Sequence, residues 1–306
     1  MNKIIIMILF SCSTFLMASE PITPLPETIK VDQAKAELGR ALFFDTILSH
    51  NDTISCASCH NLQNGGDDDL RVSFGIDGKK GEVNAPTVYN AVFNFRQFWD
   101  GRAKDLQEQA AGPIENPVEM GATFQEVIQK LKKSKYKKLF AAIYKDGITK
   151  ESITDAIAEY EKTLITPNSR FDKYLKGDEN TLTKEEKEGY ELFKSKGCVS
   201  CHHGKNIGGN LYSKFGIFDE SNSQWFGRYN VTHKERDKYF FKVPSLRNIA
   251  KTAPYFHDGR TYDLQEAVKI MSQYQLGRHI TQEEIAKITA FLQSLNGELP
   301  KNIEPQ

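Results

Sequence analysis

The sequence predicts a mainly α-helical protein of two similar domains that arose by internal duplication and are connected by long loops. Several segments carry apolar residues at helical spacing, and no segment shows the sustained alternation of a half-buried strand. Residues 86–108 match residues 244–266 without a gap, and ten of the 23 positions are identical. A chain of 306 residues with 39% hydrophobic residues is long enough to form two domains with separate cores.

The first nineteen residues are expected to be a signal peptide that does not belong to the fold. Lys3 supplies a positive charge, residues 4–17 are mostly apolar, and Ala18 is a small residue suited to cleavage. A membrane anchor is the alternative, but this apolar stretch is shorter than the roughly 20 residues that span a bilayer. We therefore expect a periplasmic protein, without a membrane span in the rest of the chain.

The remaining residues divide into an N-terminal domain at 20–165 and a C-terminal domain at 166–306. The connection is expected at 164–178, where Pro167 and Gly177 interrupt the helical pattern. The stretch 204–239 has no clear period and is expected to be a long functional loop.

Three helix starts carry capping signals. Thr149 precedes an apolar face that begins at Ile153, and Thr183 with Glu186 opens a second helix. Thr281 with Glu284 forms the Thr-x-x-Glu capping box of a third helix.

The four cysteines that follow the signal peptide all belong to two CxxCH motifs, at residues 56–60 and 198–202. This motif attaches c-type haem: Cys56 and Cys59, or Cys198 and Cys201, form thioethers to one porphyrin. The histidine that follows, His60 or His202, then binds the iron. Each of the two domains is therefore predicted to be cytochrome c-like and to carry one covalent haem.

Two other uses of the cysteine pairs fit less well. A single zinc site could draw on both pairs, but they lie far apart in the chain and each is followed by histidine. A thioredoxin-like redox motif would need a βαβ context, which the sequence does not contain.

The net charge of the chain indicates whether a nucleic acid is a plausible partner. Lys+Arg and Asp+Glu both number 40, so the formal net charge is zero. Nucleic-acid-binding domains usually have a marked basic excess, and we therefore expect no nucleic-acid partner.

In these motifs the chain resembles the bacterial di-haem cytochrome c peroxidases. The resemblance rests on the two CxxCH motifs and on the segments Asn84–Ala91, Phe98–Arg102 and Ala253–His257. It implies a periplasmic enzyme that reduces hydrogen peroxide to water at the N-terminal haem. The C-terminal haem would receive electrons from a small cytochrome c or copper protein, and the enzyme would be a homodimer.

The resemblance also implies roles for individual residues. Met271 would be the distal ligand of the second haem, where a thioether raises the reduction potential. Trp99 would carry electrons between the haems, whereas the second half of the repeat has His257 at the matching position. Glu119 and Gln109 would act on peroxide, Glu119 as acid and base and Gln109 by hydrogen bonding.

A calcium ion between the domains is implied as well. Asn84, Thr252 and Pro254 match the family's calcium-binding positions, and amide and carbonyl oxygens suit this hard cation.

One position departs from the family pattern. Many members have a distal histidine about sixteen residues after the first CxxCH motif, which leaves the iron only after the second haem is reduced. Ile76 stands at the matching position here, and it cannot bind iron. We expect an open distal site and activity without reductive priming, unless a residue such as His50 fills the position.

Two alternative functions remain. A related di-haem enzyme could oxidise a protein substrate, but those relatives replace the methionine at position 271 with tyrosine. A plain electron-transfer cytochrome would have no use for Glu119 and Gln109 beside an open site.

Overall fold

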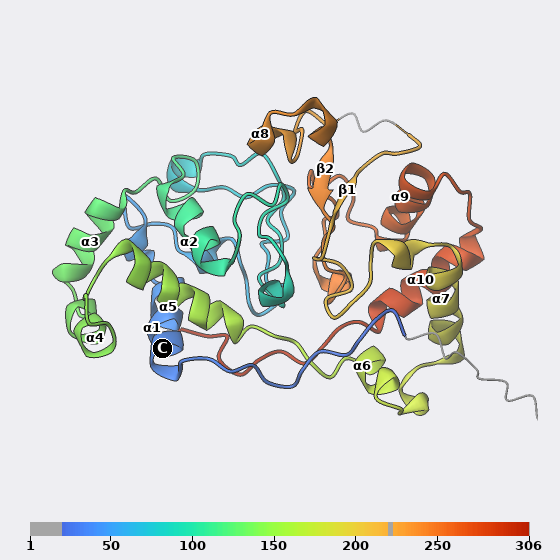
Figure 1. Ribbon diagram of the computed structural model, residues 1–306, viewed down its shortest axis with the longest axis horizontal. Coiled ribbons are helices and arrows are strands. Elements are labelled where there is room, and N and C mark those ends of the chain that lie inside the picture. Colours follow the sequence, from blue (N-terminus) through green and yellow to red (C-terminus); the bar gives the residue numbers. More distant parts are fainter. Residues whose placement is uncertain (1–19, 220–222, 306) are drawn as a thin grey trace, which may run out of the picture.

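The computed structural model describes residues 20–219 and 223–305, so the predicted signal peptide lies outside the described residues. The fold is mainly helical, as the sequence predicts. Figure 1 places α1 to α5 in one half of the molecule and α6, α7, α9 and α10 in the other. The helices are α1 (Gln33–Phe44), α2 (Leu106–Glu115), α3 (Phe124–Lys132), α4 (Tyr136–Ile143), α5 (Lys150–Lys162), α6 (Arg170–Leu175), α7 (Lys184–Ser195), α8 (Tyr229–Thr232), α9 (Leu264–Leu276) and α10 (Gln282–Gln293).

Each half is built on one closely packed pair of helices. In the first half α1 packs on α5, and a Cβ atom added to Gly39 would lie 1.8 Å from the carbonyl oxygen of Ala156. In the second half α7 packs on α10, and a Cβ atom at Gly189 would lie 1.9 Å from that of Lys287. The duplication is therefore visible in the packing, because both pairs depend on a glycine at the closest approach.

The backbone repeats as well as the packing. Asn90 and its counterpart Asn248 both have φ at 60°, and Phe98 and Phe256 have φ at 66° and 72°. Left-handed conformations are uncommon for residues other than glycine. Their recurrence at matching positions shows that both halves keep the same turns after the duplication.

The capping signals mark the helix starts correctly. Thr149, Thr183 and Thr281 each accept a hydrogen bond at the start of α5, α7 and α10, and each belongs to a capping box.

The stretch 204–239, expected to be a loop, contains short regular elements. Strand β1 (Tyr212–Lys214) pairs antiparallel with β2 (Phe240–Lys242), with Ser213 opposite Phe241. Helix α8 lies in the chain segment that connects the two strands. Strands of three residues are too short to show alternation, so the sequence gives no sign of them.

Each half has its own apolar core. The core of the first half surrounds α1 to α5 and includes Leu42, Val127, Leu131, Phe140 and Ile153. The core of the second half surrounds α7 and α10 and includes Phe171, Phe193, Phe291, Leu295 and also Ile22 from the start of the described chain.

Three segments run between the halves: residues 20–32, 163–169 and 296–305. Figure 1 shows them side by side in the lower part of the molecule, where they cross from one half to the other. Ile22 packs in the second core, before the chain enters α1 in the first half. Leu299 and Ile303 return to the first half, where they pack near Phe43 and Tyr160.

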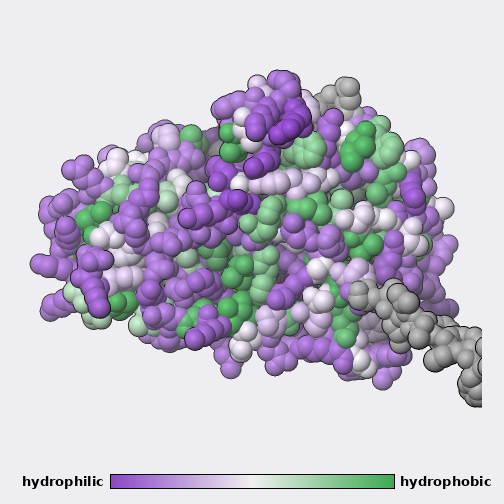
Figure 2. Space-filling model, in the orientation of Figure 1, coloured by the Kyte–Doolittle hydropathy of each residue, from purple (hydrophilic) through white to green (hydrophobic). Residues whose placement is uncertain are grey.

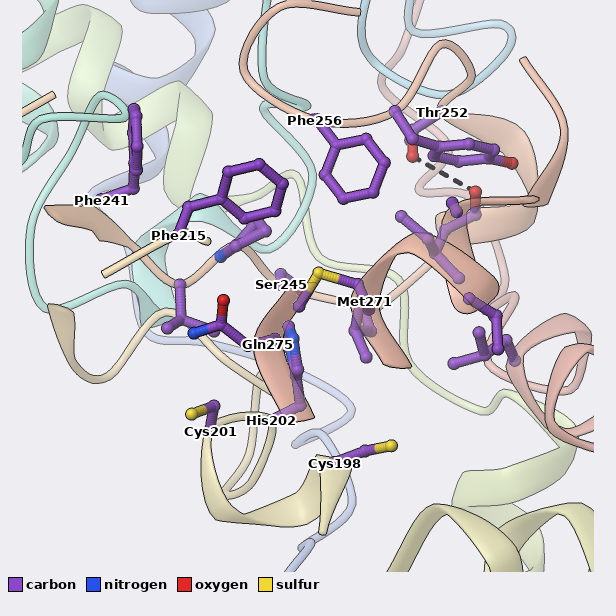
Figure 3. A pocket seen from close by; sticks show the side chains of 18 of the residues that line it. Cys198, Cys201, His202, Phe215, Phe241, Ser245, Thr252, Phe256, Met271 and Gln275 are labelled. Atoms are coloured by element: carbon purple, nitrogen blue, oxygen red, sulfur yellow. Dashed lines mark hydrogen bonds between the residues drawn. The ribbon is translucent and has the colours of Figure 1, made fainter. Parts of the chain in front are cut away.

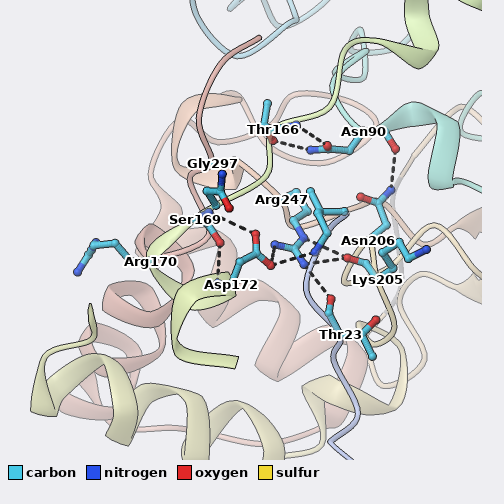
Figure 4. A network of polar contacts seen from close by, with 12 residues as sticks. Thr23, Asn90, Thr166, Ser169, Arg170, Asp172, Lys205, Asn206, Arg247 and Gly297 are labelled. Carbon is cyan, nitrogen blue, oxygen red and sulfur yellow. Dashed lines mark hydrogen bonds and ion pairs between the residues drawn. The ribbon is translucent and has the colours of Figure 1, made fainter. Parts of the chain in front are cut away.

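A buried ion pair fastens the first of these segments to the second half. Arg247 and Asp172 have fully buried side chains, 2.7 Å apart. Arg247 also donates to the carbonyl oxygens of Thr23 and Lys205, and Asp172 accepts from the backbone N–H of Leu25. Figure 4 shows this network between the first described segment and the loop after the second CxxCH motif.

The visible surface is mostly hydrophilic, and hydrophobic side chains gather beside α9 (Figure 2). Ile217 and Phe218 are the exposed residues there, at 55% and 65%, and Phe218 bonds through its backbone N–H to Tyr274 of α9. Within the described residues, every helix is too short or too polar to cross a membrane.

Candidate functional site

The first CxxCH motif forms a tight turn after α1. Cys56–Ser58 is one turn of 3₁₀-helix, and Ser55 and Ser58 close a capping box around it. Nδ1 of His60 lies 3.1 Å from the carbonyl oxygen of Gly66. That bond orients the ring and leaves Nε2 for a metal, which is the usual arrangement of a histidine ligand.

The second motif repeats this arrangement. Cys198–Ser200 is again one turn of 3₁₀-helix, and Nδ1 of His202 lies 3.4 Å from the carbonyl oxygen of Ile207. Burial lowers the pKa of His202 to about 4, so the imidazole is neutral at pH 7 and can act as a ligand.

A cavity of about 230 Å³ opens above the second motif. Cys198, Cys201, His202 and Met271 line it, and Figure 3 shows His202 and Met271 directed into the same space. A nitrogen and a thioether that face one apolar cavity are suitable axial ligands for haem iron. The residues therefore fit a c-type haem, and the role of Met271 as its distal ligand stays a prediction.

Glu119 faces the first motif. Nδ2 of Asn116 donates to its carboxyl at 2.6 Å, and its backbone carbonyl accepts from the N–H of Ile76 at 2.7 Å. Burial raises the pKa of Glu119, although Asn116 and Arg102 act in the opposite direction. Burial is the main cause of the raised pKa of Cys59, about 11, and the nearby charge of Glu119 adds to it.

The other residues predicted on the peroxide side form no hydrogen bond with the first CxxCH motif within the described part of the chain. Gln109 is half-buried on α2, and its side chain forms no hydrogen bond with a described residue. Ile76 is buried, and a Cβ atom on Gly121 would lie 3.3 Å from its side chain. His50, the alternative distal ligand, turns its exposed ring to Glu126, with Nδ1 3.0 Å from that carboxylate.

Trp99 lies at the boundary between the halves. Its Nε1–H donates to the carbonyl oxygen of Asn84 at 2.9 Å, and its ring meets His257 edge-on with centroids 6.2 Å apart. Trp99 and His257 occupy equivalent positions of the repeat, so the two copies of the motif meet where the halves join. Trp99 also lines the cavity of the second motif.

The three residues predicted to bind calcium all line that cavity. Nδ2 of Asn84 donates to the carbonyl oxygen of Leu70, which leaves its amide oxygen for another partner. The carbonyl oxygens of Thr252 and Pro254 accept no hydrogen bond from the described residues. Amide and carbonyl oxygens are ligands that suit a hard cation, and calcium binding by these three residues stays a prediction.

Three buried ionisable residues near these sites were not found from the sequence. Asp67 is 1% exposed, lines the cavity, and has a carboxyl oxygen without a partner among the described residues. Lys242 and Glu161 are each 5% exposed, and Glu161 is close enough to Cys56 to raise the pKa of that thiol. Asp67 stands in the run Gly-Gly-Asp-Asp-Asp after the first motif, which is the one signal that could have indicated it.

Family models match both halves of the chain. The model for di-haem cytochrome c peroxidases matches residues 33–180, and the model for cytochrome c matches residues 186–296.

Curated relatives agree with these matches. The chain is 51% identical over 286 residues to the cytochrome c peroxidase Ccp of Escherichia coli K12, covering 91% of this chain. It spans 62% of the length of that relative. It is 48% identical over 297 residues to cytochrome c551 peroxidase of Nitrosomonas europaea, covering 95% of this chain and 89% of the relative.

A solved structure supports the fold. A MauG-like protein associated with microbial copper homeostasis superposes with a TM-score of 0.79 and 28% identity, covering 93% of this chain and 95% of that protein.

Proposed function

Because the chain belongs to the bacterial di-haem cytochrome c peroxidases and carries two c-type haem motifs, we propose that it reduces hydrogen peroxide to water. The electrons come from a small donor protein, a cytochrome c or a copper protein. The observation that carries this proposal is the half-buried carboxyl of Glu119, which faces the first CxxCH motif and is held by Asn116.

When bound, the first haem supplies the iron at which the O–O bond of peroxide is cleaved. Glu119 accepts a proton from the peroxide oxygen nearer the haem and returns it to the departing oxygen, which leaves as water. Gln109 donates a hydrogen bond that orients the peroxide. Asn116 fixes the carboxyl through its 2.6 Å hydrogen bond, and the burial that raises the pKa of Glu119 makes this carboxylate a better proton acceptor.

His202 and Met271, which line one cavity, would hold the second haem, and this haem would supply the redox centre that receives electrons from the donor. Trp99 belongs to the first half of the chain and lines this cavity, and it would provide the path for electrons between the two haems. Two electrons and two protons convert one peroxide into two water molecules.

The distal position of the first haem is open in this proposal. Ile76 stands where related chains place a histidine, and the ring of His50 is turned away toward Glu126. The enzyme is therefore active in its fully oxidised form.

The experiment compares peroxide consumption by fully oxidised holoprotein with that of holoprotein reduced beforehand at the second haem, with a reduced cytochrome c as donor. Immediate and equal turnover in both samples is expected. A lag that pre-reduction abolishes would keep the peroxidase and contradict the open site. An absence of turnover with several cytochrome c and copper-protein donors would favour oxidation of a protein substrate or electron carriage instead.

A calcium ion between the halves is part of the proposal. Asn84, Thr252 and Pro254 would hold it through oxygen atoms. Asp67 lines the same cavity, and one of its carboxyl oxygens has no partner among the described residues, so this carboxyl would be available to the cation as well. Removal of calcium with a chelator is expected to lower turnover, and added Ca²⁺ is expected to restore it. The periplasmic location and the homodimer stay predictions.

A further inference from the structure

Lys242 is a buried cation without a partner among the residues that the structure describes. Its residue is 5% exposed at the end of β2, and its ammonium group forms no ion pair or hydrogen bond with any residue that the structure describes. Lysine is almost never fully buried unless it is paired. Burial lowers the pKa of Lys242 to about 8, and no carboxylate is close enough to offset this effect.

The position of Lys242 indicates what the missing partner is. Lys242 lines the same cavity as Cys201, His202 and Met271, which fit the second haem. Its backbone N–H donates to the carbonyl oxygen of Trp99 at 2.8 Å, so it lies between this cavity and the first half of the chain.

The other ionisable side chains that line the cavity have different roles. Lys196 is paired with Glu284, and Nε2 of His257 lies 2.8 Å from Oγ of Ser223. Asp67 is itself an acid, and His202 follows the second cysteine pair. Lys242 is therefore the uncommitted cation of the described cavity wall.

Haem brings two propionate groups into a protein, and a buried carboxylate needs a hydrogen-bonded partner of opposite charge. We propose that Lys242 pairs with a propionate of the second haem and raises the reduction potential of that haem. A cation next to the propionate offsets its negative charge, which otherwise favours the ferric over the ferrous state. The proposal needs only the bound haem, so it does not depend on the peroxidase activity.

Three variants of the holoprotein test this role: Lys242→Met, Lys242→Arg and, as a matched control, Lys196→Met. The control removes a cation from the same cavity wall that already has a carboxylate partner. Spectroelectrochemical titration gives the potential of each haem, and the pyridine haemochrome spectrum gives the haem content.

Lys242→Met is expected to lower the equilibrium constant for reduction of the second haem about tenfold. For one electron this is a fall of about 59 mV in the reduction potential. Lys242→Arg keeps the charge and is expected to keep most of the potential, and Lys196→Met is expected to change it little. An unchanged potential in fully loaded Lys242→Met overturns the proposal, and so does an equal fall in the Lys196→Met control.

A crystal structure of the wild-type holoprotein provides a test that does not depend on the folding of a variant. Nζ of Lys242 is expected within hydrogen-bond distance of a propionate oxygen of the second haem. A Lys242 ammonium group directed to a carboxylate of the chain, with both propionates bound elsewhere, contradicts the proposal.

Discussion

At the scale of single residues, the carboxyl of Glu119 combines a hydrogen bond that fixes it with a burial that favours its protonated form. Nδ2 of Asn116 donates to one carboxyl oxygen at 2.6 Å, and the backbone carbonyl of Glu119 accepts a hydrogen bond from the N–H of Ile76. A side chain that is held in place and that gains a proton easily is suited to move a proton within a bound substrate.

Glu119→Gln is expected to lower peroxide turnover by about 10²–10⁴-fold, because the amide cannot accept and return the proton. Steady-state peroxide consumption checks this. Glu115→Gln is the control, since Glu115 lies on α2 just before the same turn and pairs with Lys150 at the surface. Turnover of Glu119→Gln equal to that of this control would remove Glu119 from the mechanism.

Glu161 is a second buried carboxyl with a different consequence. Burial raises its pKa from about 4.5 to about 8, and its side chain forms no hydrogen bond with a described residue. The folded protein therefore binds more protons than the unfolded chain in this pH window. The free energy of unfolding accordingly decreases as the pH rises from about 4.5 to about 8.

Glu161→Gln is expected to flatten this part of the stability profile and to stabilise the holoprotein at pH 8 by about 1–3 kcal/mol. Denaturant unfolding at a series of pH values measures the effect. Glu151→Gln on the exposed side of the same helix provides the comparison. A pH slope that persists in Glu161→Gln would assign the effect to another group.

At the scale of elements, each haem motif depends on one helix pair that a glycine brings together. No other residue fits at Gly39 or Gly189 unless the backbone moves, because its Cβ atom would overlap a carbonyl oxygen of the opposite helix. A bulkier residue there would separate the helices and shift the turn that carries the cysteines.

Gly39→Ala is therefore expected to destabilise the first half by about 1–3 kcal/mol, because overpacking forces the backbone apart. Thermal unfolding followed by circular dichroism is the measurement. Gly112→Ala on α2 serves as a control, since its added methyl would meet the ring of Phe98, which is a side chain that can move. Equal stability of Gly39→Ala and the wild type would show that the helices do not depend on this contact.

The features that the sequence predicts are local ones. The CxxCH turns and the caps at Thr149, Thr183 and Thr281 are complete within a few residues, so the pattern alone indicates them. The burial of Lys242 and Glu161 depends on segments far away in the chain. The three-residue strands β1 and β2 also form only because distant residues bring them together, and no local pattern marks them.

At the scale of the whole molecule, the three segments between the halves are fixed by contacts at both ends. The pair of Arg247 and Asp172 holds the first described segment, the start of α6 and the loop after the second CxxCH motif in one network. Its side chains are completely buried, so loss of one partner leaves an unpaired charge in the interior.

Arg247→Met is expected to reduce the stability of the second half by about 3–5 kcal/mol. The double variant Arg247→Met with Asp172→Asn should recover part of that loss, since no ionised group is then left alone. Chemical unfolding of the single and double variants gives the coupling between the two residues. A double variant that is less stable than the sum of the single changes would argue against the buried charge as the cause.

The return of residues 296–305 to the first half has a consequence for the order in which the protein is built. These residues are synthesised after both CxxCH motifs, yet Leu299 and Ile303 cover side chains of the first half, and Asn302 bonds to Tyr160 and Thr163. A domain usually folds as a unit while the chain emerges. The first half of this chain would acquire its last contacts only after the second half has been synthesised. The final contacts of the fold would therefore form against helices that were synthesised first.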